Sequence, residues 1–206
     1  MEDEWCLCAK RELETDGLFV TPKILSDGEL VALRAAADDT WDTLRRALCA
    51  RPHPAPTIAY AEVTQKDGGR FDCRTQAEPY ASLFAADSRL ARGLRAVLGG
   101  DDAEVVALGL VIAPSAATLA ELEGGANGGA DDQCTDGHQR FHTDGASAGS
   151  AADAPPSLTL FVPLVNLTEH NGTEFIPGSH RDAAPDPLRA FALSVPAGSA
   201  VGLGPR

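Results

Sequence analysis

Residues 157–181 read SLTLFVPLVNLTEHNGTEFIPGSHR, and this stretch decides the fold class. Its first part, 158–167, is rich in residues that favour β-strands. Asn171-Gly172 favours the tight turn that joins two antiparallel strands, and a second short arm follows at 173–176. We therefore expect a β-hairpin whose arms are residues 158–167 and 173–176.

The sequence on either side of this hairpin indicates further strands. Pro163 lies inside the first arm and has no backbone donor, so that strand requires an edge position or a bulge. Upstream, AEVVALGLVIAP at 103–114 is a short apolar run that ends at a proline, which predicts a buried strand. Downstream, FALSVPAGSAVGLGPR at 191–206 is typical of a strand, a turn and the start of one more strand.

Two helices are expected before most of these strands. The run at 16–25 predicts a strand, and SDGE at 26–29 is a capping box that predicts a helix start. The apolar residues that follow recur at steps of three and four and form one helical face: Leu30, Leu33, Ala37, Trp41, Leu44 and Leu48. A second helix is expected over 88–98, with Gly99-Gly100 as its stop. The order of elements predicts an α+β chain whose second part is an antiparallel β-sandwich or jelly roll.

Composition and charge limit the classes of function. The chain has 206 residues, of which 44% are hydrophobic, and this predicts one globular domain over 1–206. The formal charge is −13 with scattered Lys and Arg, so we expect no nucleic-acid partner. No basic leader and no apolar run of the roughly 20 residues that span a bilayer are visible, which predicts a cytoplasmic protein without a membrane span. Nothing in the sequence indicates the oligomeric state.

The cysteines favour reduced thiols over a disulfide framework. There are five of them, an odd number with irregular spacing. Cys6 and Cys8 form a Cys-x-Cys pair, but no second pair lies at the spacing of a zinc site. We therefore expect a terminal segment that is typical of disordered ends and binds no metal.

The stretch HQRFHTDG at 138–145 contains a candidate metal site. His142 and Asp144 are two residues apart, so on a strand both side chains face the same way and could supply two of the three ligands of a non-haem iron(II) site. A competing hypothesis places His138 and His142 on one helical face as zinc ligands. The threonine and glycine that flank Asp144 and the absence of a His-Glu-x-x-His motif count against that helix.

Taken together, QRFHTDG at 139–145 and LTLFVPLVNLTEHNGTEFIPGSHR at 158–181 resemble the phytanoyl-CoA dioxygenase family. DGLFVTPKILSDGELVALRAA at 16–37 resembles the opening strand and helix of that family. The resemblance implies a single domain with a core of about 16–206, and a glycine- and aspartate-rich flexible insertion is expected at about 114–137. The implied fold is N-terminal helices with an antiparallel double-stranded β-helix (jelly roll, cupin-like). The implied activity is hydroxylation of a small or lipidic substrate with Fe(II), 2-oxoglutarate and oxygen.

The resemblance also assigns roles residue by residue. His142 and Asp144 match the first two iron ligands of the family, while the residues that bind 2-oxoglutarate are not identified. His180 and Arg181 match a proline-glycine-serine-histidine loop that is generally not a ligand position. The residues expected to shape turns rather than act chemically are Asn171, Gly172, Pro177 and Gly178. His170 lies beside the expected hairpin tip, where we expect an exposed side chain rather than a third ligand.

The family places a distal histidine, and then an arginine for 2-oxoglutarate, after a segment like LSVPAGSAVGLGPR at 193–206. We therefore expect a C-terminally truncated chain with an incomplete β-helix, in which neither role has a holder. Two hypotheses follow. The first is an Fe(II)- and 2-oxoglutarate-dependent dioxygenase that would be active in its complete form. The second is a non-catalytic binding or interaction module that retains the fold without a functional iron site.

Overall fold

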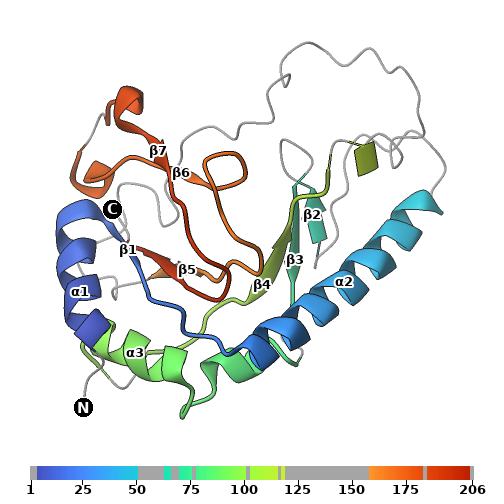
Figure 1. Ribbon diagram of the computed structural model, residues 1–206, viewed down its shortest axis with the longest axis horizontal. Helices are drawn as coiled ribbons and strands as arrows, with labels where there is room; N and C mark the ends of the chain where they lie inside the picture. Colours follow the sequence, from blue (N-terminus) through green and yellow to red (C-terminus); the bar gives the residue numbers. More distant parts are fainter. Residues whose placement is uncertain are drawn as a thin grey trace. The chain divides into compact units, whose positions relative to one another are not determined.

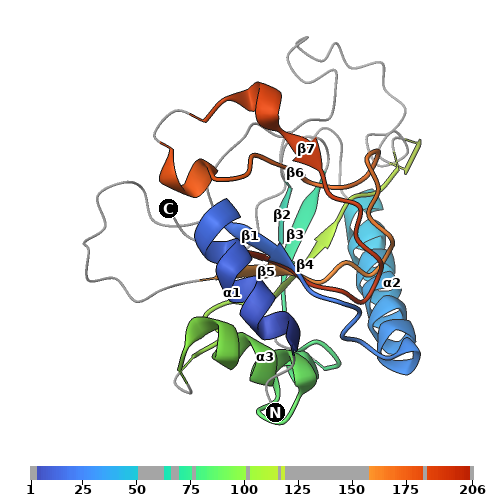
Figure 2. The same cartoon turned by 60° about the vertical axis from the view of Figure 1, so that its left-hand side comes forward.

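The structure is a computed structural model (Figures 1 and 2) that describes residues 4–50, 63–65, 70–75, 78–100, 103–115, 117–118, 158–182 and 185–204. The described residues cluster into two compact units. Unit 1 contains those up to 32, from 83 to 104 and from 158 onward, and unit 2 contains the remainder. Both units combine helical residues with antiparallel strands.

A three-stranded antiparallel sheet lies at the centre of unit 1. Its strands are β1 (Leu18–Val20), β8 (Val201–Leu203) and β5 (Thr159–Phe161), in the order β1-β8-β5. Because β8 is the middle strand, Gly202 lies opposite Phe19 on one side and Leu160 on the other. The sheet therefore joins the beginning of the described chain to its end.

Two helices pack against this sheet. They are α1 (Glu4–Asp16) and α3 (Arg89–Leu98), and Figure 2 shows α1 in front of the strands with α3 beside it. The buried residues of this core are Cys6, Ala9, Phe19 and Val97, and those packed against them are Trp5, Leu13, Leu94, Ala96, Leu158 and Leu160. The ring of Phe19 is fully buried at the centre of this core.

The helix α1 corrects the expectation of a disordered end. Its signal in the sequence is the helical spacing of Cys6, Ala9 and Leu13, all of which contribute to the core. Cys6 is buried and Cys8 is exposed, because residues two apart on a helix point in different directions. The Cys-x-Cys pair therefore does not form one metal site within α1.

The helix α2 (Asp27–Cys49) begins as the capping box predicts. The backbone N–H of Glu29 donates to Ser26 Oγ over 3.2 Å, and that of Ser26 donates to Glu29 Oε2 over 2.7 Å. Hydrogen bonds from the side chain and backbone of Ser26 lower the pKa of the Glu29 carboxyl. The helix start is thus held by two reciprocal bonds.

The helix α3 also agrees with its prediction. The backbone N–H of Ala91 donates to Ser88 Oγ over 3.0 Å, so Ser88 caps the helix. At the other end Gly99 has a φ of 79°, the left-handed conformation that ends many helices. A single 3-10 turn, η2 (Ala81–Phe84), precedes α3.

Unit 2 contains a second antiparallel sheet with the order β2-β3-β4, formed by β2 (Val63–Gln65), β3 (Phe71–Arg74) and β4 (Gly109–Ile112). Its buried core combines Leu44 and Leu48 from α2 with Phe71 and Cys73 from β3. Trp41, Leu110 and Ile112 pack against these residues. The predicted apolar face of α2 is confirmed, since Leu30 and Leu33 in its first half are buried as well.

The predicted buried strand at 103–114 is shorter and more exposed than expected. Only Gly109–Ile112 is a strand, and the side chains of Val106 and Val111 are 94% and 47% exposed. Within the described part of the sheet, β4 pairs with β3 alone. The apolar run thus forms an edge strand with one face on the core, which periodicity by itself does not distinguish from a fully buried strand.

The predicted hairpin of 158–167 with 173–176 is wrong. β5 pairs with β8, and β6 (Glu174–Phe175) pairs with β7 (Phe191–Ala192). A single bridge joins Leu167 to Val195. The strand β5 ends before Pro163, because proline has no backbone N–H to donate to a neighbouring strand.

The end of the chain agrees with its prediction, since β7 is followed by a turn and then by β8. Two 3-10 turns, η3 (Ser179–Arg181) and η4 (Pro187–Arg189), lie between β6 and β7. No helix in the described ranges is long and apolar enough to cross a membrane.

Candidate functional site

The two predicted iron ligands, His142 and Asp144, lie outside the described residues, and so does His138. The predicted insertion at 114–137 also lies almost entirely outside them. The structure does describe β5, the strand that follows the motif in the chain, and the turns that carry the rest of the resemblance.

The sheet of unit 1 has a second face, opposite the one that carries Phe19. Side chains alternate along a strand, so Val20, Val201 and Phe161, which are aligned across the three strands, point away from the Phe19 core. Val201 is 1% exposed and the other two are half-buried. The second face of the sheet therefore carries an apolar row to which each of the three strands contributes one residue.

The turn at 168–172 is held by Asn171. Its Oδ1 accepts hydrogen bonds from the backbone N–H of Thr168 over 2.7 Å and from Thr168 Oγ1 over 3.0 Å. A Cβ on Gly172 would lie 2.7 Å from the carbonyl oxygen of Thr168 and 2.8 Å from that of Leu193. Gly172 is therefore required by close backbone packing, and both residues shape a turn as predicted.

The proline-glycine-serine-histidine loop fastens the end of α1. Gly178 has a φ of 74°, and its N–H donates to the carbonyl of Asp16 over 2.8 Å. Next to it, the imidazole of His180 lies over Gly17, where an added Cβ would lie 2.7 Å from His180 Cγ. The loop therefore contacts the helix end and the turn into β1.

His180 has a structural role in this contact. Its Nε2 lies 3.3 Å from the carbonyl oxygen of Glu14, which can only accept, so Nε2 carries the proton. Its Nδ1 is buried and makes no hydrogen bond to any residue that the structure describes. The sequence gives no local signal for this role, because Glu14 is 166 residues away in the chain.

His170 lies at the surface, as predicted. Its side chain is 84% exposed, and its Nε2 is 3.5 Å from Glu169 Oε1. Within the described ranges, no group of three or more histidine, cysteine, aspartate or glutamate side chains is arranged to hold a metal ion. The iron site with His142 and Asp144 as ligands therefore stays a prediction.

Comparison with known proteins supports the fold. No protein-family model matches the chain, and no curated protein matches its sequence. A crystal structure of the non-heme alpha-ketoglutarate-dependent carbocyclase SnoK from nogalamycin biosynthesis matches 96% of this chain and 74% of its own, with 15% identity and a TM-score of 0.58. AviO1 from Streptomyces viridochromogenes Tue57 matches 99% of this chain and 85% of its own, with 17% identity and a TM-score of 0.58.

A third structure, the non-heme alpha-ketoglutarate-dependent epimerase SnoN from nogalamycin biosynthesis, matches 98% of this chain and 72% of its own, with 15% identity and a TM-score of 0.52. At these identities the likeness shows the fold. The chain thus has the mixed helical and antiparallel architecture of proteins that include non-heme alpha-ketoglutarate-dependent enzymes. The described strands form three small sheets rather than a complete double-stranded β-helix.

Proposed function

We propose that this chain forms the iron-binding part of an Fe(II)- and 2-oxoglutarate-dependent dioxygenase of the phytanoyl-CoA dioxygenase family. Its substrate would be a small or lipidic molecule. The proposal rests on the agreement of two independent observations. The motif at 139–145 predicts this chemistry, and the fold is similar to that of enzymes named as alpha-ketoglutarate dependent.

The predicted donors fit iron(II). An imidazole nitrogen from His142 and a carboxylate oxygen from Asp144 would hold the metal on one side, as two members of a facial triad. Iron bound with 2-oxoglutarate would supply the oxidising chemistry. We assign no third ligand, because His170 is exposed beside Glu169 and His180 is packed on Gly17.

Other residues of unit 1 would prepare the site. The row of Val20, Val201 and Phe161 would provide an apolar wall across the three strands of the unit 1 sheet and would exclude water from the substrate. The loop at Gly178 and His180 would hold the end of α1 in place, and so fix the position at which β1 begins. Neither role requires a reactive side chain.

Metal binding tests this proposal directly. Calorimetry with Mn(II), an air-stable substitute for Fe(II), should detect one specific site. His142→Ala and Asp144→Ala should each weaken binding by at least about 100-fold, because each removes a direct ligand. His170→Ala is the matched control and should leave the affinity unchanged, since that side chain is exposed.

Activity provides the second measurement. A version of the protein extended past Arg206 and loaded with Fe(II) should convert 2-oxoglutarate to succinate, and His142→Ala should abolish this conversion. Circular dichroism spectra that match the unsubstituted chain would show that the variants are folded. Metal binding that is absent, or insensitive to His142→Ala, would contradict the proposal and would favour a non-catalytic interaction module with the same fold.

A further inference from the structure

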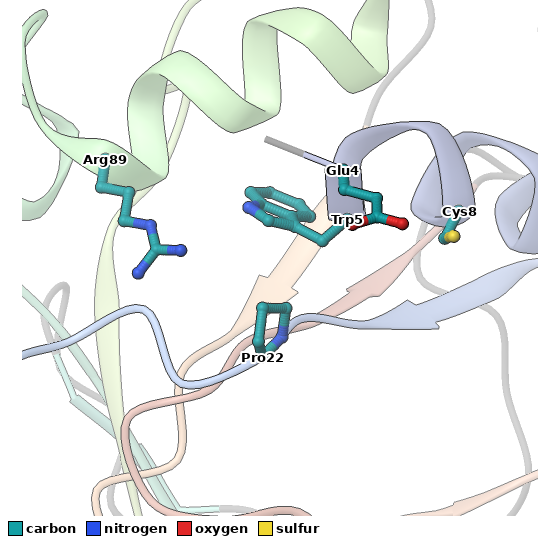
Figure 3. Close-up of a pocket in the computed structure, with 5 residues that line it drawn as sticks. All are labelled: Glu4, Trp5, Cys8, Pro22 and Arg89. Atoms are coloured by element: carbon teal, nitrogen blue, oxygen red, sulfur yellow. The ribbon is translucent and has the colours of Figure 1, made fainter. Parts of the chain in front are cut away.

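An open pocket lies at the start of α1, entirely within unit 1 (Figure 3). It is lined by Glu4, Trp5, Cys8, Pro22 and Arg89 and has a volume of about 470 Å³. These residues come from α1, from the segment after β1 and from the first position of α3. None of them belongs to the predicted iron motif, and all except the partly buried Trp5 are exposed, so a ligand would bind on an accessible surface.

Two apolar surfaces face the pocket. The indole of Trp5 lies against α3, where a Cβ on Gly93 would lie 2.5 Å from Trp5 Cη2. Glycine at position 93 therefore allows the indole to settle directly on the helix backbone. In Figure 3 the indole and the ring of Pro22 lie on two sides of the same space. A flat apolar group fits between them, because aromatic faces stack well on flat partners.

The charged groups lie at different ends of the pocket. Figure 3 shows the guanidinium of Arg89 at one side, while the carboxylate of Glu4 points towards Cys8. Arg89 is the first residue of α3, where the helix dipole adds to its positive charge. A guanidinium has five N–H donors, so Arg89 can bind a carboxylate and keep its other contacts.

We infer that this pocket binds a small molecule that combines a flat apolar body with a single carboxylate. The carboxylate contacts Arg89, and the apolar body lies between Trp5 and Pro22. The negative charge of Glu4 disfavours a second carboxylate at the opposite end of the ligand. A dianion such as 2-oxoglutarate is therefore a poor ligand here.

The test uses 2-naphthoate as the monoanionic probe, with 2-naphthamide and naphthalene-2,6-dicarboxylate as its neutral and dianionic counterparts. The chain has two tryptophans, so the indole N–H signals in a proton–nitrogen NMR spectrum report both locations. Trp5 lines the pocket, and Trp41 packs in the core of unit 2. A Trp41→Phe variant assigns the two signals.

We expect 2-naphthoate to shift the Trp5 signal in a saturable manner and to leave Trp41 unchanged. The neutral amide should bind about threefold to tenfold more weakly, which is the gain typical of an accessible guanidinium–carboxylate pair. Arg89→Gln should reduce the affinity for 2-naphthoate to that for the amide. Arg92→Gln removes the same charge from an exposed position of α3 outside the pocket and should have no effect.

A Glu4→Gln variant tests the second charge, because it should improve binding of the dicarboxylate and not of 2-naphthoate. Several results would overturn the inference. They are an unchanged Trp5 signal, equal affinity for acid and amide, or an equal effect of Arg89→Gln and Arg92→Gln. Equal shifts of Trp5 and Trp41 would also overturn it, since they would indicate adsorption without a site.

Discussion

Replacing Gly202 with alanine should destabilise unit 1 by about 2 kcal/mol, even though it adds only one methyl group. Gly202 lies in β8, between β1 and β5, and directly opposite Phe19. A Cβ at this position would lie 3.0 Å from Phe19 Cδ1 and still closer to Cε1 and Cζ of the same ring. Ordinary contacts of a Cβ begin at 3.4 Å, so either the ring or the strand must move.

The expected magnitude combines two opposing effects. The backbone of Gly202 does not have a positive φ, so alanine adds no conformational strain and reduces the entropy of the unfolded chain, a gain of about 0.4–1 kcal/mol. Overpacking of a well-filled core costs about 1–3 kcal/mol. The upper part of that range applies here, because Phe19 is fully buried against Cys6, Ala9 and Val97 and has no free direction in which to move.

Urea denaturation followed by circular dichroism measures this loss. Gly28→Ala is the matched control, because Gly28 lies in the first turn of α2 with no atom within 4 Å of its added Cβ. It should be neutral or stabilise the protein by up to about 1 kcal/mol. Combining Gly202→Ala with Phe19→Leu should recover part of the loss. A Gly202→Ala protein as stable as the unsubstituted chain, or strictly additive effects in the double variant, would refute the packing of Phe19 on β8.

Three further outcomes are expected. Ser26→Ala should cost about 1 kcal/mol at neutral pH, because Ser26 Oγ accepts the backbone N–H of Glu29 and donates to its carboxylate. Since the pKa of Glu29 is lower in the folded than in the unfolded state, the carboxylate part of this cost should be present above pH 4.5 and disappear as the pH falls through the folded-state pKa, while the backbone part remains; denaturation at several pH values would detect this. A maleimide should label the exposed Cys8 and Cys49 quickly and the buried Cys6 and Cys73 slowly, as followed by mass spectrometry. Burial and the charge of Asp72 raise the pKa of the Cys73 thiol, which lowers its reactivity further. Rapid labelling of Cys73 would contradict this. His180→Ala should destabilise the protein by about 1–2 kcal/mol, because it loses the packing on Gly17 and the hydrogen bond to Glu14. His170 is exposed, so His170→Ala should change the stability by less than about 0.5 kcal/mol. Equal effects of the two variants would count against the structural role of His180.

The sequence by itself determined the features that depend on a few neighbouring residues. The capping box at Ser26 and the stop at Gly99 were both predicted and both present, because each is formed by hydrogen bonds within one helical turn. The proposed ligands His142 and Asp144 were likewise identified by their spacing and by the family resemblance of the flanking segments, and they stay a prediction.

Tertiary structure decided which strands pair. Asn171-Gly172 indicated a hairpin between neighbouring segments, but β5 pairs with β8 and β6 pairs with β7. A turn motif specifies how the chain reverses, whereas the partner of a strand depends on which edge buries the most apolar surface. No local pattern contains that information.

Tertiary structure also decided at which positions close packing requires a particular side chain or a glycine. Gly202 is necessary because of Phe19, and His180 packs on Gly17, yet each pair is far apart in the chain. The pocket at Trp5 and Arg89 is formed in the same way, from α1 and α3. Such contacts arise only when the core of unit 1 brings distant segments together, so their physical cause is burial in three dimensions rather than spacing in the sequence.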